Sequence, residues 1–131
     1  MSKYAFIIGE APDDYRMKKT EDMYNFFQTK EGGSFPKKNI ITFPNGINEF
    51  MLQTVINNCL KEGTEEVLLY ICKKLPIPNS TKTFFIGKEE IRFETLTYFE
   101  NLAKSQSITF TYLFDSCTDI RPEEEFGFEE V

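Results

Sequence analysis

The sequence predicts an α/β protein, a three-layer sandwich with a mostly parallel four-stranded sheet and a small β-hairpin. Four short, continuous apolar runs are typical of strands that helices cover on both faces. Between these runs, apolar residues recur every three or four positions, which is the spacing of an amphipathic helix. Strand–helix–strand units of this kind cross over right-handed and place helices on both sides of a parallel sheet.

The four apolar runs give the predicted strands their positions. Pro44 and the Asn45-Gly46 turn signal end the second strand. Functional side chains of parallel sheets gather at the carboxyl ends of the strands, so the residues that follow each run are the first candidates for a site. In chain order the predicted strands are Tyr4 to Ile8, Asn39 to Phe43, Val67 to Cys72 and Ile108 to Phe114.

The first helix is expected to begin near Thr20, after a polar loop over residues 11–19, and to end at the pair Gly32-Gly33. Apolar residues at spacing i, i+3 and i+4 should turn one face of this helix toward the sheet. The members of that face are Met23, Phe26 and Phe27.

The second helix carries the clearest pattern in the chain. Asn48 is a typical N-cap, because its side-chain oxygen can accept a hydrogen bond from a free backbone N–H, and Gly63 is a typical C-cap. Cys59 lies on the apolar stripe and is expected to be a core thiol. The stripe comprises Leu52, Val55, Ile56, Cys59 and Leu60.

A hairpin and a third helix complete the predicted elements. Thr83 to Ile86 and Glu90 to Phe93 flank Gly87-Lys88, which favours a tight turn between two strands. Glu94 is expected to open the third helix, with Leu96, Phe99 and Leu102 on its buried side. Residues 1–120 then form one domain, and residues 121–131 form an acidic tail.

Composition argues against several classes of function. The 15 Lys and Arg against 21 Asp and Glu give a net charge of −6, which disfavours binding to nucleic acid or to an anionic membrane. The chain has no His, so it holds no Ser-His or Cys-His pair of its own. No CxxC pair and no EF-hand spacing is present, so we expect no metal and no cofactor.

The three cysteines and the apolar runs bear on location. No apolar stretch approaches membrane-spanning length, so we expect no membrane partner. Three cysteines at wide spacings are typical of free thiols in a reducing compartment. We therefore expect a cytoplasmic protein.

The segment LFDSC, Leu113 to Cys117, resembles the strand and nucleophile motif of caspase and metacaspase peptidases, often written DSC-x-x-G. The run VLLYICKK resembles the strand that leads to the catalytic His of that family. Aligning Tyr70 with the last Tyr of the family segment places Lys73 at the His and Lys74 at the following Gly. YAFIIGE and the run that begins EDMYNFF resemble its first strand and first helix. The resemblance covers about residues 3–119 and implies a caspase-like sheet of order 2-1-3-4.

The resemblance also implies roles for individual residues. Cys117 stands at the nucleophile position, Lys73 at the position of the acid–base His, and Lys74 at an oxyanion-hole position. Arg16 falls near a place where caspases use an Arg to bind an acidic substrate side chain. Asp22 stands at an acidic position of the family pattern. The substrate-pocket candidates are Arg16, Asp22 and Asp115.

Departures from the family pattern bear on activity. A Lys in place of the His is a poor proton shuttle near neutral pH unless burial lowers its pKa by several units. A Lys in place of the Gly disturbs the close backbone approach of an oxyanion hole, and Thr118 to Arg121 lacks the Gly that follows DSC-x-x. Caspase domains continue into further strands that complete the substrate groove, and we expect these to be missing here.

These observations favour a catalytically inactive caspase-like domain that binds or regulates a protein partner. One alternative is a cysteine endopeptidase subunit with Cys117 as nucleophile, completed by another chain. A receiver- or flavodoxin-like signalling domain is a second alternative, because Asp115 and Lys73 loosely mimic its strand-end residues. The predicted fourth strand, Ile108 to Phe114, is apolar and carries no Lys or Pro, so we expect an exposed edge that pairs with a protein partner or with a second copy of the chain.

Overall fold

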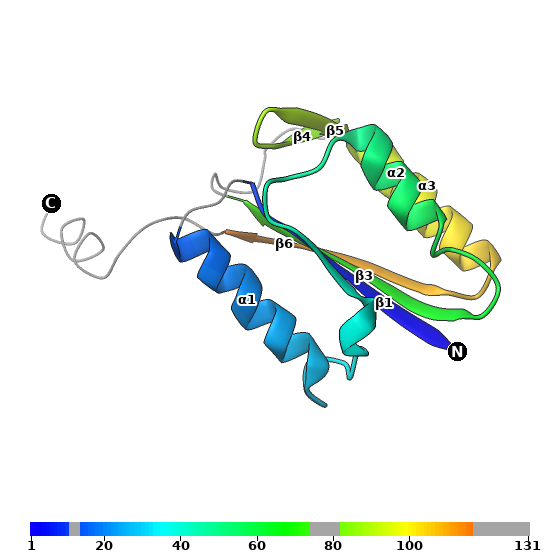
Figure 1. The fold of residues 1–131 in the computed structure, drawn as a ribbon. Helices are drawn as coiled ribbons and strands as arrows, with labels where there is room; N and C mark the ends of the chain where they lie inside the picture. Colours follow the sequence, from blue (N-terminus) through cyan, green and yellow to red (C-terminus); the bar gives the residue numbers. More distant parts are fainter. Residues whose placement is uncertain (11–13, 74–81, 117–131) are drawn as a thin grey trace, which may run out of the picture.

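The computed structural model describes residues 1–10, 14–73 and 82–116 and contains six strands and three α-helices (Figure 1). A 3-10 turn at Lys37–Asn39 precedes the second strand. The strands are β1 (Ser2–Ile8), β2 (Ile40–Phe43), β3 (Thr64–Lys73), β4 (Thr83–Ile86), β5 (Glu89–Arg92) and β6 (Thr109–Ser116). The helices are α1 (Asp14–Gln28), α2 (Glu49–Asn57) and α3 (Phe93–Ser105).

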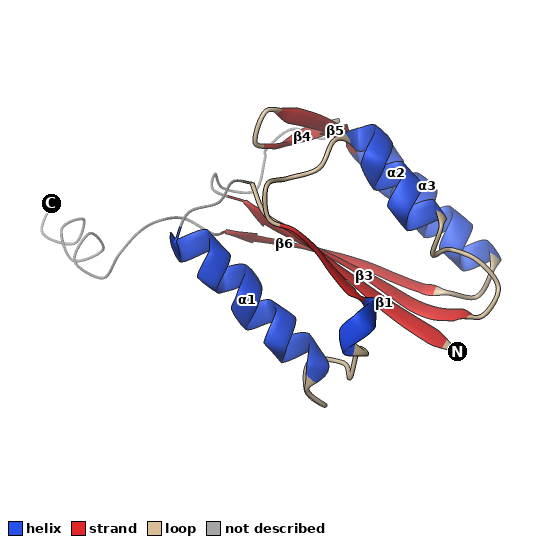
Figure 2. Ribbon diagram, in the orientation of Figure 1, coloured by secondary structure: helices blue, strands red, loops and turns tan. Residues whose placement is uncertain are grey.

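The long strands form one parallel sheet in the order β2-β1-β3-β6. This order confirms the predicted order 2-1-3-4, because β6 is the fourth of the predicted long strands. Helix α1 covers one face of the sheet, whereas α2 and α3 cover the other, so the predicted layers are present (Figures 1 and 2). β4 and β5 form a separate antiparallel pair on the side of α2 and α3.

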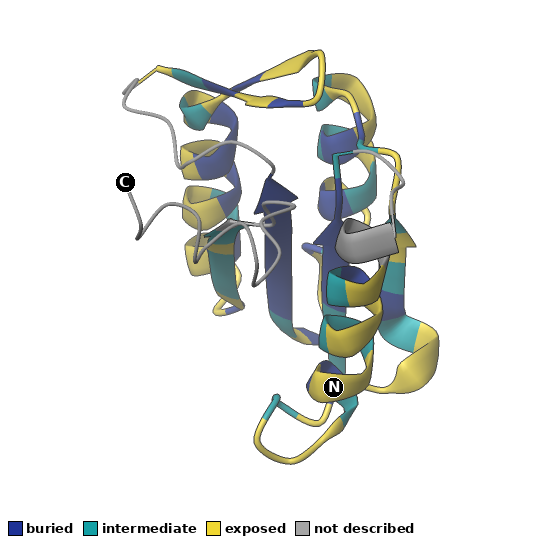
Figure 3. Ribbon diagram, turned by 90° about the vertical axis from the view of Figure 1, so that its left-hand side faces the viewer, coloured by how far each residue is buried: buried dark blue, intermediate teal, exposed yellow. Residues whose placement is uncertain are grey.

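The sheet has a hydrophobic core on each face, and successive side chains of each strand alternate between the two cores. Figure 3 shows buried residues gathered on the central strands. Leu69 and Ile71 of β3 face α2 and α3, where they pack in one core with Phe99. On the opposite face, Tyr70 packs against Phe27 of α1, with the ring centroids 5.9 Å apart and the rings nearly perpendicular. Burial on both faces is the reason that these strands are continuous apolar runs.

Helix α1 differs from its prediction in length and in its inner face. It begins at Asp14 rather than near Thr20, so most of the predicted loop is helical, and it ends at Gln28 rather than at Gly32. The early turns carry no apolar stripe, which is why the sequence pattern missed them. Phe27 is buried, but Phe26 is 45% exposed. The inner face comprises Thr20, Met23, Tyr24 and Phe27.

Helix α2 begins as predicted and ends earlier. The Asn48 Oδ1 atom accepts a hydrogen bond from the backbone N–H of Met51 at 2.7 Å, which confirms the predicted N-cap. The helix ends at Asn57, so Gly63 is not its C-cap. Gly63 has φ +93° and lies in the turn into β3, where a left-handed backbone favours glycine.

The hairpin and α3 are close to the prediction, with small shifts. β5 begins at Glu89, and Phe93 is the first residue of α3 rather than the last of the hairpin. Leu102 is only half-buried, and Ala103 is buried instead. Among the described residues, no helix is both long and apolar enough to cross a membrane.

Two of the strands extend beyond their predicted ends. β3 continues to Lys73, one residue past the predicted strand, and β6 continues to Ser116, two residues past Phe114. The pairing between β3 and β6 reaches these last residues, with Cys72 opposite Asp115 and Lys73 opposite Ser116. The charged side chains of the carboxyl edge therefore stand on regular strands, whose alternation decides which face each one occupies.

Candidate functional site

The carboxyl ends of β1, β3 and β6 meet at one edge of the sheet, because these strands are parallel neighbours. Lys73 is the last residue of β3, and Asp115 lies next to the end of β6. Glu10 follows β1 at the same edge. This edge is the candidate functional site, and its charged side chains form two separate groups.

The first group is a buried ion pair between Lys73 and Glu10. The Lys73 Nζ atom lies 3.0 Å from Glu10 Oε1 and also donates a hydrogen bond to the carbonyl oxygen of Phe85 in β4. The side chains of Lys73 and Glu10 are only 6% and 11% exposed. The predicted strand ended at Cys72, one residue before Lys73, and so did not anticipate this burial. Lys73 follows Leu69 and Ile71 on the inner face, where the β4–β5 hairpin covers it.

The second group joins Asp115 to α1 and β3. The hydroxyl of Tyr70 donates a hydrogen bond to Asp115 Oδ2 at 2.5 Å, and the Nζ atom of Lys19 lies 3.3 Å from the same oxygen. Burial of the phenol raises the pKa of Tyr70, and the hydrogen bond to Asp115 and the charge of Asp115 raise it further. Tyr70 therefore stays protonated and acts as a fixed donor to the carboxylate.

The two groups occupy opposite faces of the sheet. Successive side chains of a strand alternate between faces, so Tyr70 lies on the α1 side and Lys73 on the side of α2 and α3. Asp115 shares the face of Tyr70, to which it is hydrogen-bonded. Lys73 and Asp115 thus come to the same edge of the sheet but do not meet, and the structure does not assemble the strand-end pair of a receiver domain from them.

The other predicted site residues are Asp22 and Arg16 on α1, and Lys74 and Cys117. Asp22 lies on α1 with 59% of its side chain exposed and forms a surface ion pair with Lys18 at 3.5 Å. Arg16 is within α1 rather than before it. Lys74 and Cys117 lie outside the described residues. Asp22 therefore pairs with Lys18, which is not a predicted site residue. Among the described side chains, it contacts neither Lys73 nor Asp115.

The cysteines depart from the expectation of three free thiols. Cys59 is free and half-buried against the core of α2 and α3, and burial raises the pKa of its thiol. Cys72 is fully buried and is disulfide-bonded. The prediction of a free thiol is therefore wrong for Cys72.

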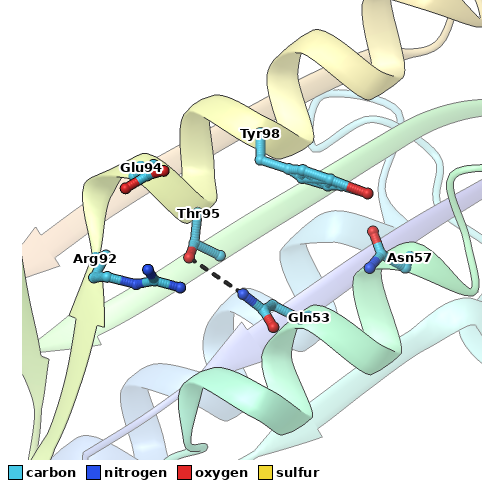
Figure 4. A pocket seen from close by; sticks show the side chains of 6 residues that line it. All are labelled: Gln53, Asn57, Arg92, Glu94, Thr95 and Tyr98. Carbon is cyan, nitrogen blue, oxygen red and sulfur yellow. Dashed lines mark hydrogen bonds between the residues drawn. The ribbon is translucent and has the colours of Figure 1, made fainter.

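A polar groove between α2 and α3 is a feature that the sequence did not predict. It encloses about 370 Å³, and Figure 4 shows Tyr98 reaching from α3 toward Asn57 on α2. At its floor the Gln53 amide donates to the Thr95 hydroxyl at 3.5 Å. No local spacing joins residues of two helices more than 40 positions apart, so no sequence pattern could have revealed the groove.

One wall of this groove is fixed by Glu49. Its Oε2 atom accepts hydrogen bonds from the backbone N–H of Arg92 at 2.7 Å and from the Thr95 hydroxyl at 3.1 Å, while Oε1 accepts from Arg92 Nε at 3.0 Å. Arg92 is the N-cap residue of α3 but makes no capping bond with its own side chain. Glu49 therefore caps α3 from another helix.

The ionisation of Glu49 follows from these contacts. Burial alone raises the pKa of Glu49, but the hydrogen bonds from the Arg92 backbone and the Thr95 hydroxyl, with the nearby guanidinium, outweigh that effect. Together they hold the pKa of Glu49 below its ordinary value of 4.5. The carboxylate is therefore the form that stabilises the start of α3.

No metal centre is formed by the residues that the structure describes. Within residues 1–10, 14–73 and 82–116, no three Cys, Asp or Glu side chains lie close enough together to hold a metal ion.

Comparisons of the chain with protein-family models, with curated proteins and with solved structures find no match. The candidate site is accordingly described by its own geometry.

We expect Lys73→Met to destabilise the protein by about 3–5 kcal/mol, because it leaves the Glu10 carboxylate buried without its partner. The double variant Lys73→Met/Glu10→Leu should recover part of this loss, since it removes both charges together. Lys18→Met, in the exposed pair with Asp22, is the matched control and should change the stability by less than about 1 kcal/mol. Urea unfolding followed by circular dichroism measures all three. A Lys73→Met variant as stable as wild type contradicts the buried pair.

We expect Glu49→Gln to lower the free energy of unfolding at pH 7 by about 1 kcal/mol, the usual contribution of an N-cap. The folded pKa of Glu49 is lowered, so this contribution is present above pH 4.5 and disappears as the pH falls through the folded value. Wild type and variant should therefore converge in stability in acid. Glu100→Gln, which removes one exposed carboxylate from α3, is the control. A difference that grows below pH 4.5 contradicts the capping role.

Proposed function

We propose that this chain is a catalytically inactive, caspase-like domain that binds a protein partner through the outer edge of β6. The observation that carries the proposal is the state of this edge, since β3 is the sole strand paired with β6 in the described part of the chain. An edge strand presents a row of N–H and C=O groups to any strand that approaches it. Pairing with a partner strand is a common way to use such a row.

The side chains of β6 leave its edge unguarded. Edge strands are usually protected by Lys, Pro, a bulge or a very short length, and β6 has none of these over Ile108 to Phe114. Leu113 is 45% exposed on the α1 side. On the other side the rings of Phe110, Tyr112 and Phe114 are half-buried, with consecutive centroids 6.3 and 6.0 Å apart. Within the described part of the chain, the edge therefore combines unpaired backbone groups with apolar surface.

The strand order and the motif at the end of β6 support the caspase-like interpretation. β6 contains Leu113 to Ser116 of the LFDSC segment, and its neighbour β3 carries Lys73 at its end. The partners of Lys73 support inactivity, since Glu10 and the Phe85 carbonyl hold its ammonium under the hairpin. A general base must reach the proton that it removes, whereas the Lys73 ammonium is already engaged by these two acceptors. These contacts weigh against the peptidase-subunit alternative.

The β6 edge is tested by hydrogen exchange at residue resolution on dilute, monomeric protein. Along an edge strand, amides that face β3 should be protected, and amides that face outward should exchange at rates close to those of an open chain. We therefore expect protection that alternates along Ile108 to Phe114. Protection of every amide of this segment in a monomer contradicts the proposal, because the edge would then already be covered by the chain itself.

We expect no peptidase activity, with or without Ca²⁺, on a mixed library of peptides with basic and acidic P1 residues. The reason is that the chain has no His and that Lys73 is held by Glu10. Mass spectrometry of the library before and after incubation measures cleavage. Cleavage that is lost in Cys117→Ala and retained in Cys59→Ala would identify a working Cys117 nucleophile and favour the peptidase alternative.

A further inference from the structure

We infer that the strand that pairs with the β6 edge belongs to a second copy of this chain, in an antiparallel arrangement with Tyr112 on the two-fold axis. This inference rests on the proposed function, because it names the occupant of the same edge. A two-fold interface uses the same surface on both copies, so the surface must match itself. The side-chain pattern of β6 matches itself in this way. The fixed positions of its rings and the placement of its charges also favour such a pair.

The side chains of β6 form a pattern that reads alike in both directions. The segment Phe110-Thr111-Tyr112-Leu113-Phe114 has an aromatic residue at its centre and at both ends. In an antiparallel pair centred on Tyr112, Phe110 faces Phe114 of the second copy, and Thr111 faces Leu113. Aromatic pairs directly opposite each other stabilise neighbouring strands. A partner strand of another sequence would gain nothing from this symmetry.

The rings of this pattern are already fixed by the core of one copy. The Phe110 ring packs 5.8 Å from the ring of Phe99, and the Phe114 ring packs 5.0 Å from the ring of Phe84, centroid to centroid. Their inner sides are therefore held while their outer parts remain accessible. Association that uses side chains already held in place loses less conformational entropy than association that must order them.

Symmetry and charge agree on the orientation of the second copy. A two-fold axis perpendicular to the sheet makes the two copies of β6 antiparallel, and Asp115 then faces Thr109 of the other strand rather than a second carboxylate. Like charges directly opposite each other destabilise a strand pair. Residues 117–131, which hold six acidic residues and one Arg, begin where β6 ends. The antiparallel pair places the two copies of Ser116, the last residue of β6, at opposite ends of the joined strands, roughly 26 Å apart at 3.3 Å per residue.

The test is a charge-pair experiment at positions 111 and 113, which face each other across the proposed axis. Both side chains lie outside the two hydrophobic cores, and Leu113 is exposed. Wild type should show a concentration-dependent dimer by light scattering and sedimentation velocity. Thr111→Lys and Leu113→Glu should each weaken the dimer roughly tenfold or more. The double variant Thr111→Lys/Leu113→Glu should restore it, because opposite charges then face each other twice.

Two controls keep the experiment decisive. Thr42→Lys places the same charge on β2, the other edge of the sheet, and should leave the dimer unchanged. Circular dichroism of every variant establishes that it is folded, and an equimolar mixture of the two single variants should form a mixed dimer. Folded single variants with no recovery in the double variant would overturn the register centred on Tyr112.

The outcomes separate this inference from the proposed function. A wild-type protein that stays monomeric at high concentration, with alternating hydrogen exchange along β6, overturns the second copy and leaves the partner-binding edge in place. Uniform protection of β6 in a monomer overturns the proposed function itself. A dimer in which the outward amides of β6 become protected as concentration rises supports both.

Discussion

The buried contact of Lys73 with Glu10 and the Phe85 carbonyl is the constraint on which the carboxyl edge of the sheet depends. A charge removed from water is tolerated only when partners replace its hydration, so the ammonium requires both acceptors. These acceptors belong to the segment after β1 and to the hairpin, so one side chain ties three parts of the chain together. Gly87, with φ +62°, supplies the left-handed backbone of the hairpin turn between β4 and β5.

Successive side chains of a strand point to opposite faces of the sheet, and this alternation decides on which face each charged group of the edge lies. Lys73 is one residue from Cys72 and three from Tyr70, so it faces the hairpin while they face α1. Asp115 is bound to Tyr70 and Lys19 on the α1 side. The thickness of the sheet separates the two groups, and each is satisfied by its own partners. Such an arrangement satisfies the charges of the edge and weighs against acid–base chemistry shared between the two groups.

The local sequence determined the elements and much of their order. Continuous apolar runs located the four long strands, because a strand that is covered on both faces carries apolar side chains on both. The stripe through Leu52 and Ile56 located α2, and Asn48 fixed its first residue, because a cap depends on neighbours three positions away. The strand order came from the resemblance to caspases and agreed with the observed sheet. The start of α1 was missed, since its first turns have no apolar period.

Only the tertiary structure decided which groups meet. The predicted third strand ended at Cys72, and Lys73 is buried because β3 runs one residue further and the hairpin covers its end. Glu49 gave no sign that it caps α3, since Arg92 and Thr95 are more than 40 positions away along the chain. Periodicity reports which face of an element is apolar, and it carries no information on the partner of a polar side chain. That partner is set by the packing of distant elements, whose contacts have no fixed spacing in the sequence.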